Sequence, residues 1–134
     1  MIAYTGIGFI RKDQLVLLKV LKSKIHRATV TDANLEYEGS ITLDQSLMEA
    51  AGFREYEKVA IWNVTNGNRL STYVMTPAPP GSGVVCINGS AAHKCQKGDV
   101  VILACFVSMT EEEYKDHKPI KIYMSENNQI KKIT

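Results

Sequence analysis

The chain has 134 residues, of which 45% are hydrophobic and 22% charged, with a formal net charge of +2; these values are ordinary for one globular domain. A charge this small does not by itself indicate a polyanionic partner, and without a run of about twenty apolar residues no membrane span is expected. The three cysteines and three histidines show no disulfide or metal-ligand spacing, so reduced thiols in a cytoplasmic protein without a metal fit best.

Residues 1–20 are expected to be an N-terminal extension ahead of a single domain that spans residues 21–134. Charged residues at 11–13 interrupt two short apolar runs, and the first run lacks the charged start and small-residue cleavage site of a secretory signal. A competing interpretation makes 14–18 an extra strand at a sheet edge. The basic run over 11–27 suits a nucleic-acid patch or, more often, a solvated face.

The region around Gly39-Ser40 is expected to consist of short extended pieces joined by a turn. Alternation and β-branched residues predict a strand over 24–30. The composition of 32–34 predicts a turn. Residues 35–38 then form an extended piece that leads into Gly39-Ser40, and 41–43 continue in extended conformation.

Local signals predict the remaining elements. Asp44 is placed to cap a helix over 45–51, which Gly52 would end. The Asn66-Gly67 pair is a strong hairpin signal. The further strands are expected over 58–65, 69–75, 84–87, 100–107, 120–124 and 129–133, with helical turns at 90–93 and after a Thr110–Glu113 capping box. Many short strands with brief helices predict a mostly-β closed barrel.

The Gly39-Ser40 bond offers a particular chemistry. Glycine has no Cβ and adopts strained geometry readily, so the Ser40 hydroxyl has an open approach to the Gly39 carbonyl. Attack there would convert the amide into an ester, and elimination of the ester would break the chain. Taken alone, a Gly-Ser pair is far more often an ordinary turn.

The segments around this bond carry a much more specific pattern. In the order of its segments and nearly in their spacing, the chain resembles the pyruvoyl-dependent aspartate 1-decarboxylase family from about residue 21 to near its C-terminus. The segments that carry the resemblance are 24–31, 33–40 with Glu38-Gly39-Ser40, 61–73, 88–93 and 97–102. The resemblance implies a small double-psi β-barrel that assembles as a homotetramer.

The resemblance also implies a cofactor made from the chain itself. The chain would cleave between Gly39 and Ser40 into a β chain ending at Gly39 and an α chain starting at residue 40. Ser40 would become a pyruvoyl group that forms a Schiff base with the substrate, without a metal or pyridoxal phosphate. Loss of an α-carboxylate leaves an electron pair that needs such a sink. The sequence leaves open whether a maturation factor helps cleavage.

The family's site residues are carried over only where this sequence matches them. Tyr73 matches the proton donor, and Thr72 matches a hydroxyl that assists cleavage and binds the substrate. Arg69 and Lys24 match residues around the substrate carboxylates, and an arginine fork suits a carboxylate in bidentate fashion. The substrate-binding backbone segment matches Gly89, Ser90 and Ala91, where the family commonly has alanine at the second position; the weaker matches near the pocket are Asn88, Trp62, His26 and Tyr37.

The implied function is conversion of L-aspartate to β-alanine and CO2, which in the family supplies pantothenate and coenzyme A synthesis. One alternative is a pyruvoyl decarboxylase of another acidic amino acid such as glutamate, because one methylene of pocket length discriminates by only about 10–200-fold. A second alternative is a non-catalytic small β-barrel binding module. The basic run supports it, but the aromatic residues that such modules use to stack bases are not interleaved there.

Overall fold

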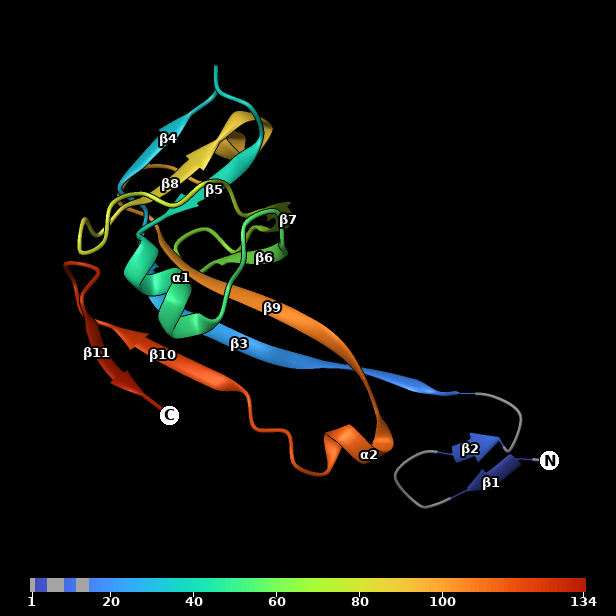
Figure 1. Ribbon diagram of the computed structural model, residues 1–134. Helices are drawn as coiled ribbons and strands as arrows, with labels where there is room; N and C mark the ends of the chain where they lie inside the picture. The colour runs from blue at the N-terminus through green and yellow to red at the C-terminus, as the bar shows by residue number, and fades with distance from the viewer. Residues whose placement is uncertain (1, 5–8, 12–14) are drawn as a thin grey trace.

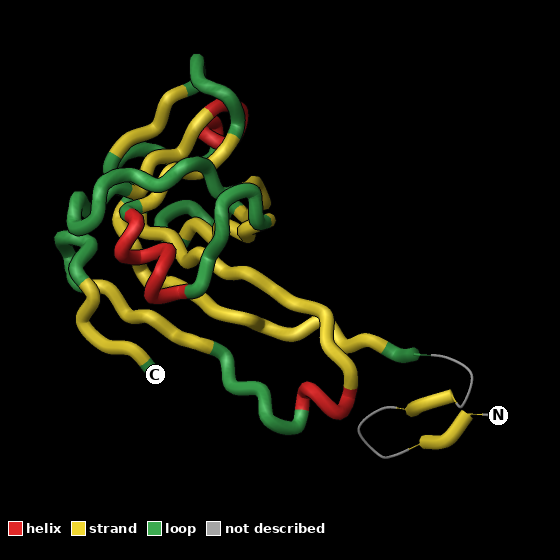
Figure 2. The backbone as a smooth tube through the Cα atoms, viewed as in Figure 1, coloured by secondary structure: helices red, strands yellow, loops and turns green. Residues whose placement is uncertain are grey.

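The computed structural model describes residues 2–4, 9–11 and 15–134. Strands dominate it (Figure 1), and short helices are few (Figure 2). The strands are β1 (Ile2–Tyr4), β2 (Phe9–Arg11), β3 (Leu17–Thr29), β4 (Asp32–Asn34), β5 (Ser40–Leu43), β6 (Lys58–Asn63), β7 (Arg69–Tyr73), β8 (Val85–Asn88), β9 (Val100–Thr110), β10 (Ile120–Met124) and β11 (Ile130–Ile133). The helices are α1 (Gln45–Ala51), the 3₁₀ helix η1 (Gly89–His93) and α2 (Glu111–Tyr114). The expected mostly-β fold with short helices is confirmed. In the described part of the chain, no helix has the length and apolar character needed to cross a membrane.

Two sheets form the body of the molecule, and β1 pairs with β2 separately. The larger sheet has the order β11-β10-β3-β9-β6-β7 and the smaller has the order β4-β8-β5. In Figure 1 the smaller sheet lies toward one end of the long β3–β9 ribbon and α2 lies at the other. A parallel bridge between Ile41 and Val74 links the sheets, and the Met75 N–H donates to the Ile41 carbonyl at 2.9 Å. This arrangement is consistent with a small β-barrel.

Alternation along the strands places one face of each sheet in a common core. In β6, Val59 and Ile61 are buried while the residues between them point outward. The smaller sheet contributes Ile41 and Ile87 to the same cluster, and α1 covers it with Leu47. Burial of such side chains contributes about 1.5–3 kcal/mol each. The core therefore fixes which face of each sheet remains for a site.

The first strand of the large sheet is longer than predicted. β3 begins at Leu17 and pairs with β9 from Leu17 opposite Thr110. The boundary expected after residue 20 therefore falls inside a paired strand, because the second half of β9 supplies a partner for these residues. The competing interpretation expected an extra strand over 14–18. Leu17 and Leu18 from that range lie in β3, whereas residue 14 lies outside the described residues.

The segment before Gly39 differs from the sequence prediction. Residues 32–34 form β4, parallel to β8, and not a turn. The turn instead occupies 35–37, where an extended piece was expected. Asn34 explains the shift, because its side-chain oxygen accepts the Glu36 N–H at 3.0 Å, an arrangement typical of asparagine in turns. Pairing with a strand distant in sequence thus overrides the local turn signal of β4.

The other local signals are confirmed. Asp44 caps α1, and Gly52 ends it in the left-handed conformation with φ 69°. Residues 64–68, with Asn66-Gly67, connect β6 to β7, which pair as an antiparallel hairpin. Thr110 and Glu113 form the expected capping box on α2. These elements depend on signals within a few residues, which is why the sequence predicts them well.

Asp44 also anchors the proline- and glycine-rich loop that follows β7. Its side chain is 2% exposed and accepts the backbone N–H groups of Ser46 at 2.8 Å, Gly81 at 3.0 Å and Gly83 at 2.9 Å. Burial alone would raise the pKa of this carboxyl, but the hydrogen bonds to Gly83, Ser46 and Gly81 outweigh burial and lower it. The ionised form therefore stabilises the loop.

We expect Asp44→Asn to lower the free energy of unfolding by about 1–3 kcal/mol at pH 7, since bonds from N–H groups to a charged acceptor are lost. A folded-state pKa below the unfolded value gives stability that is present above the unfolded pKa, near 3.8, and is lost as pH falls through the folded pKa. Urea unfolding at pH 7 and at a pH well below 3.8, where the carboxyl is protonated in both states, measures this. The variant and the unmodified chain should converge in acid, while Glu49→Gln, on an exposed carboxylate of α1, should match the unmodified chain at both pH values.

Candidate active site

Ser40 is the buried first residue of β5 and lies opposite Asn88 of β8. Its hydroxyl donates to the Glu38 carbonyl at 3.3 Å and accepts from Asn88 Nδ2 at 3.2 Å. Two further Gly-Ser pairs occur, Gly81-Ser82 in an exposed loop and Gly89-Ser90 at the start of η1. Of the three serines, Ser82 and Ser90 are exposed, and only the Ser40 hydroxyl is both buried and held from two sides.

Asn88 connects this serine to a neighbour that sequence reasoning missed. Its Nδ2 also donates to Thr42 Oγ1 at 3.1 Å. Ser40 and Thr42 are two residues apart on β5, and side chains at that spacing share one face of a strand. The sequence shows that Ser40 and Thr42 are two residues apart, but it does not show that β5 pairs with β8.

Two glycines allow the chain to pass closely beside the Gly39-Ser40 bond. Gly89 has φ 67°, and a Cβ on it would lie 2.5 Å from Gly39 Cα and N and 2.8 Å from the Tyr37 carbonyl oxygen. No side chain fits there, so Gly89 is required both for its conformation and for the contact. A Cβ on Gly39 would lie 3.9 Å from Ser90 Oγ. The start of η1 is therefore packed directly against the bond, and substrate binding by Gly89, Ser90 and Ala91 stays a prediction.

A hollow of about 470 Å³ opens on the outward face of the small sheet beside these residues. Tyr37 and Asn88, two of the predicted site residues, contribute to it. The full lining is Asp32, Asn34, Tyr37, Thr42, Met75, Thr76, Val84, Cys86 and Asn88. The exposed lining is more apolar than polar, with polar groups from Asp32, Asn34, Thr42, Thr76 and Asn88, a mixture common in ligand sites.

Tyr73 and Thr72 lie at the end of β7, where the two sheets meet. The bridge between Ile41 and Val74 is parallel, so the preceding residues, Ser40 and Tyr73, lie beside one another along the two chains. Tyr73 is 36% exposed. Thr72 is half-buried and, by alternation, on the opposite face of β7. The backbone of Tyr73 therefore lies beside that of Ser40.

The remaining predicted residues lie on the outer face of the large sheet. The strand register places Lys24 in one row across the sheet with Ala104, Ala60 and Ser71. Two residues further along β6, Trp62 lies opposite Arg69 of β7. The Arg69 guanidinium carbon lies 4.9 Å from the Trp62 ring centroid, a geometry typical of cation–π contacts. This basic and aromatic surface, the outer sheet face, continues to His26, whose ring lies 5.5 Å from that of Tyr123.

The charge state of His26 follows from its neighbours. Burial, and then the positive charges of Lys24 and Arg27, lower the pKa of its imidazole. His26 is therefore neutral at neutral pH, and Lys24 and Arg69 supply positive charge on the outer sheet face.

The predicted site residues consequently fall into two groups. The first surrounds Ser40 and contains Asn88, Gly89 and Tyr37. The second is the outer sheet face, where Arg69 and Trp62 line a separate hollow of about 270 Å³. Arg69 thus lines a different hollow from the one beside Ser40.

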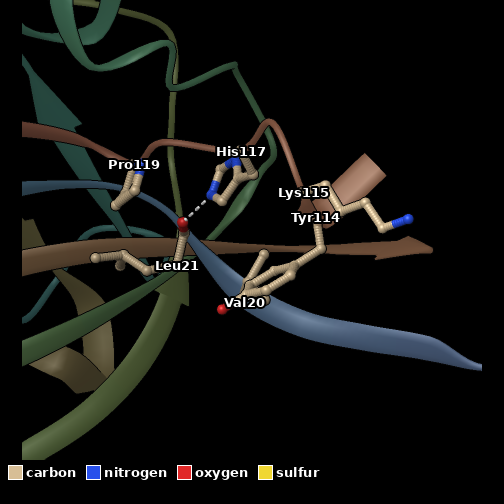
Figure 3. Close-up of a pocket in the computed structure, with 6 residues that line it drawn as sticks. All are labelled: Val20, Leu21, Tyr114, Lys115, His117 and Pro119. Carbon is tan, nitrogen blue, oxygen red and sulfur yellow. Dashed lines mark hydrogen bonds between the residues drawn. The ribbon is translucent and has the colours of Figure 1, made fainter. Parts of the chain in front are cut away.

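Another hollow, of about 380 Å³, lies where the segment after α2 returns to β3 (Figure 3). His117 Nε2 donates to the Leu21 carbonyl at 2.7 Å, next to a register shift in β3. Figure 3 shows that the imidazole points at this carbonyl. His117 therefore ties the segment after α2 to β3. Elsewhere in the described residues, no group of three or more His, Cys, Asp or Glu side chains gathers to hold a metal.

Comparison with known proteins shows which sequences this chain is similar to. The sequence matches the family described as Aspartate decarboxylase over residues 16–131. A protein named aspartate 1-decarboxylase from Clostridium kluyveri is 57% identical over 117 residues, covering 87% of this chain and 91% of the relative. Proteins of the same name from Syntrophus aciditrophicus (58% over 112 residues, covering 84% of this chain and 96% of the relative) and Caldicellulosiruptor saccharolyticus (53% over 119 residues, 89% and 92%) are similarly close. The matched region includes both groups of candidate residues.

Proposed function

The chain belongs to the aspartate decarboxylase family, and on that premise we propose that it converts L-aspartate to β-alanine and CO2 with a pyruvoyl group made from Ser40. Relatives named for aspartate favour this substrate over glutamate and favour an enzyme over a binding module. The observation that carries the proposal is the enclosure of the Ser40 hydroxyl between the Glu38 carbonyl and the Asn88 amide. Three unpaired cysteines fit the cytoplasm.

Cleavage begins when Ser40 Oγ attacks the Gly39 carbonyl carbon. The C–N bond breaks, and the hydroxyl proton passes to the released amine, which leaves an ester. Loss of the Ser40 α-proton then breaks the Cβ–O bond, frees the Gly39 carboxylate and leaves a dehydroalanine. Addition of water and release of ammonia yield the pyruvoyl carbonyl. Each step uses only the chain and water.

The residues present fit this chemistry. Asn88 holds Ser40 Oγ on one side, and Gly89 leaves the backbone of Gly39 free of any opposing Cβ. The enclosed position keeps bulk water from the ester. Fixed geometry of this kind converts a slow reaction between separate groups into an intramolecular one.

Once formed, the pyruvoyl group held at position 40 would supply a carbonyl that binds the substrate amine and an electron sink for decarboxylation. Tyr73, placed beside Ser40 by the Ile41–Val74 bridge, then donates the proton to the α-carbon. Thr72 and the backbone of Gly89, Ser90 and Ala91 bind the substrate. Successive N–H groups in such a segment suit an anionic oxygen.

Arg69 and Lys24 bind the substrate carboxylates from the outer sheet face of a second subunit. Arg69 lines a different hollow from the one beside Ser40 within one chain, which supports this arrangement. The Arg69 guanidinium is held in place by the Trp62 ring, so its fork is oriented before the carboxylate arrives. A homotetramer would repeat the shared site at equivalent interfaces.

We expect Tyr73→Phe to cleave normally but to turn over aspartate about a hundredfold or more slowly, since the ring remains and only the proton donor is lost. The comparison of fragment yield with β-alanine formation measures both effects. Tyr56→Phe, which removes an exposed phenol near Tyr73, is the matched control. Turnover near that of the unmodified chain in fully cleaved Tyr73→Phe protein would assign the proton to another group.

The whole proposal is tested by purifying the protein, measuring its intact mass and supplying L-aspartate or L-glutamate. We expect fragments 1–39 and 40–134, the second with a pyruvoyl terminus, and release of β-alanine and CO2 from aspartate in preference to glutamate. A single uncleaved chain without decarboxylation would reject the function. Faster release of CO2 from glutamate would change the substrate but keep the chemistry.

A further inference from the structure

Four polar side chains form a square on the outward face of the small sheet. Ser40 lies opposite Asn88, and Thr42 lies opposite Cys86. Directly opposed residues of an antiparallel pair share one face, and the residues between them, such as Ile41 and Ile87, point into the core. Cys86 is a member of this square that the reaction described above does not use.

The Cys86 thiol contacts the amide that holds Ser40. Its Sγ donates to Asn88 Oδ1 at 3.2 Å, while Asn88 Nδ2 donates to Ser40 at 3.2 Å and to Thr42 at 3.1 Å. Both N–H bonds and the carbonyl of this amide are therefore satisfied within the square. Burial, and then the charge of Asp32, raise the pKa of the thiol, so it stays protonated and able to donate at neutral pH.

The thiol is one of the three contacts that orient the amide. An asparagine side chain has donors on one side and an acceptor on the other, and it turns to suit its neighbours. With a donor at Oδ1, Nδ2 must face Ser40. The Ser40 hydroxyl then points its own proton at Glu38, which leaves a lone pair toward Asn88. Without the thiol, the amide loses one of the contacts that fix this orientation.

We propose that Cys86 is a positioning residue for self-cleavage: it orients the Asn88 amide, which in turn holds the Ser40 hydroxyl beside the Gly39 carbonyl. This inference rests on the proposed function, because it concerns the same bond. It assigns Cys86 no contact with the substrate. Its effect therefore appears in the rate of chain cleavage, before any substrate is bound.

The test follows cleavage of the full chain after synthesis in a cell-free system, with the appearance of fragments 1–39 and 40–134 as the readout. We expect Cys86→Ala and Cys86→Val to cleave about three- to tenfold more slowly, the effect of one lost hydrogen bond. Cys86→Ser restores a donor and should recover most of the rate. Valine fills the space that alanine would leave empty, so it separates the lost donor from a packing defect, and melting temperatures check folding.

A double-mutant comparison tests the route through the amide. In an Asn88→Ala background, Cys86→Ala should slow cleavage no further, because its target is gone. If Asn88→Ala cleaves too slowly to follow, the ranking of alanine, valine and serine at position 86 decides alone.

Equal rates in all three Cys86 variants and the unmodified chain would overturn the inference, as would a serine variant as slow as alanine or a further slowing in the Asn88→Ala background. If the unmodified chain cleaves but the variants give any of these contradicting results, only the role of Cys86 is rejected. If the unmodified chain itself never cleaves, the proposed function fails.

Discussion

Replacement of Ser40 by alanine is expected to leave one uncleaved chain without decarboxylase activity. Alanine removes the attacking oxygen, and neither Asn88 nor Thr42 can take its place: Asn88 Nδ2 is a donor only, and Thr42 lies two residues further along β5. Because both the peptide bond and the later electron sink depend on the same residue, the loss should be complete. Intact mass measures the first effect, and β-alanine formation measures the second.

The matched control is Ser82→Ala, which alters another Gly-Ser pair, Gly81-Ser82, in the exposed loop. That chain should still cleave between Gly39 and Ser40 at the rate of the unmodified protein. Cleavage of the Ser40→Ala chain at the peptide bond that follows Gly39 would contradict the acyl-shift chemistry. Cleavage at Gly81 would show that the local dipeptide, and not its enclosure, selects the bond.

Local signals explain how much of the fold could be predicted. The Asp44 cap, the Asn66-Gly67 connection and the Thr110–Glu113 box each act within a few residues, and all three predictions are confirmed. β4 was not predicted, since its pairing with β8 joins residues more than fifty positions apart. A turn signal at Asp32 cannot report a partner at Cys86.

The site shows the same division. The family resemblance points to Ser40, Asn88 and Gly89, and the structure brings them together. Thr42 and Cys86 could not be found in this way, because their relevance depends on the register of β5 against β8. The sequence also could not show that Arg69 lines a different hollow from the one beside Ser40, because that depends on how the two sheets are placed.

That separation leads to a prediction about assembly. Arg69→Ala should cleave normally and lose most activity toward aspartate, since it removes the bidentate partner of a carboxylate. Ser40→Ala chains should be inactive but carry an intact Arg69. If a working site takes the pyruvoyl from one subunit and Arg69 from the next, subunit exchange between these two inactive proteins should restore about a quarter of full activity, because half of the chains supply each part at random.

The control for this mixture uses a residue expected to act within the same chain as Ser40. The Ile41–Val74 bridge places Tyr73 beside Ser40 of its own chain, so mixing Ser40→Ala with Tyr73→Phe should restore nothing. Native mass spectrometry with one protein isotopically labelled confirms that subunits exchange in both mixtures. Exchange without recovery in the Arg69 mixture would place Arg69 and the pyruvoyl in one chain. Recovery in the Tyr73 mixture would move the proton donor to the neighbouring subunit, and full activity in a stable monomer would refute the shared site.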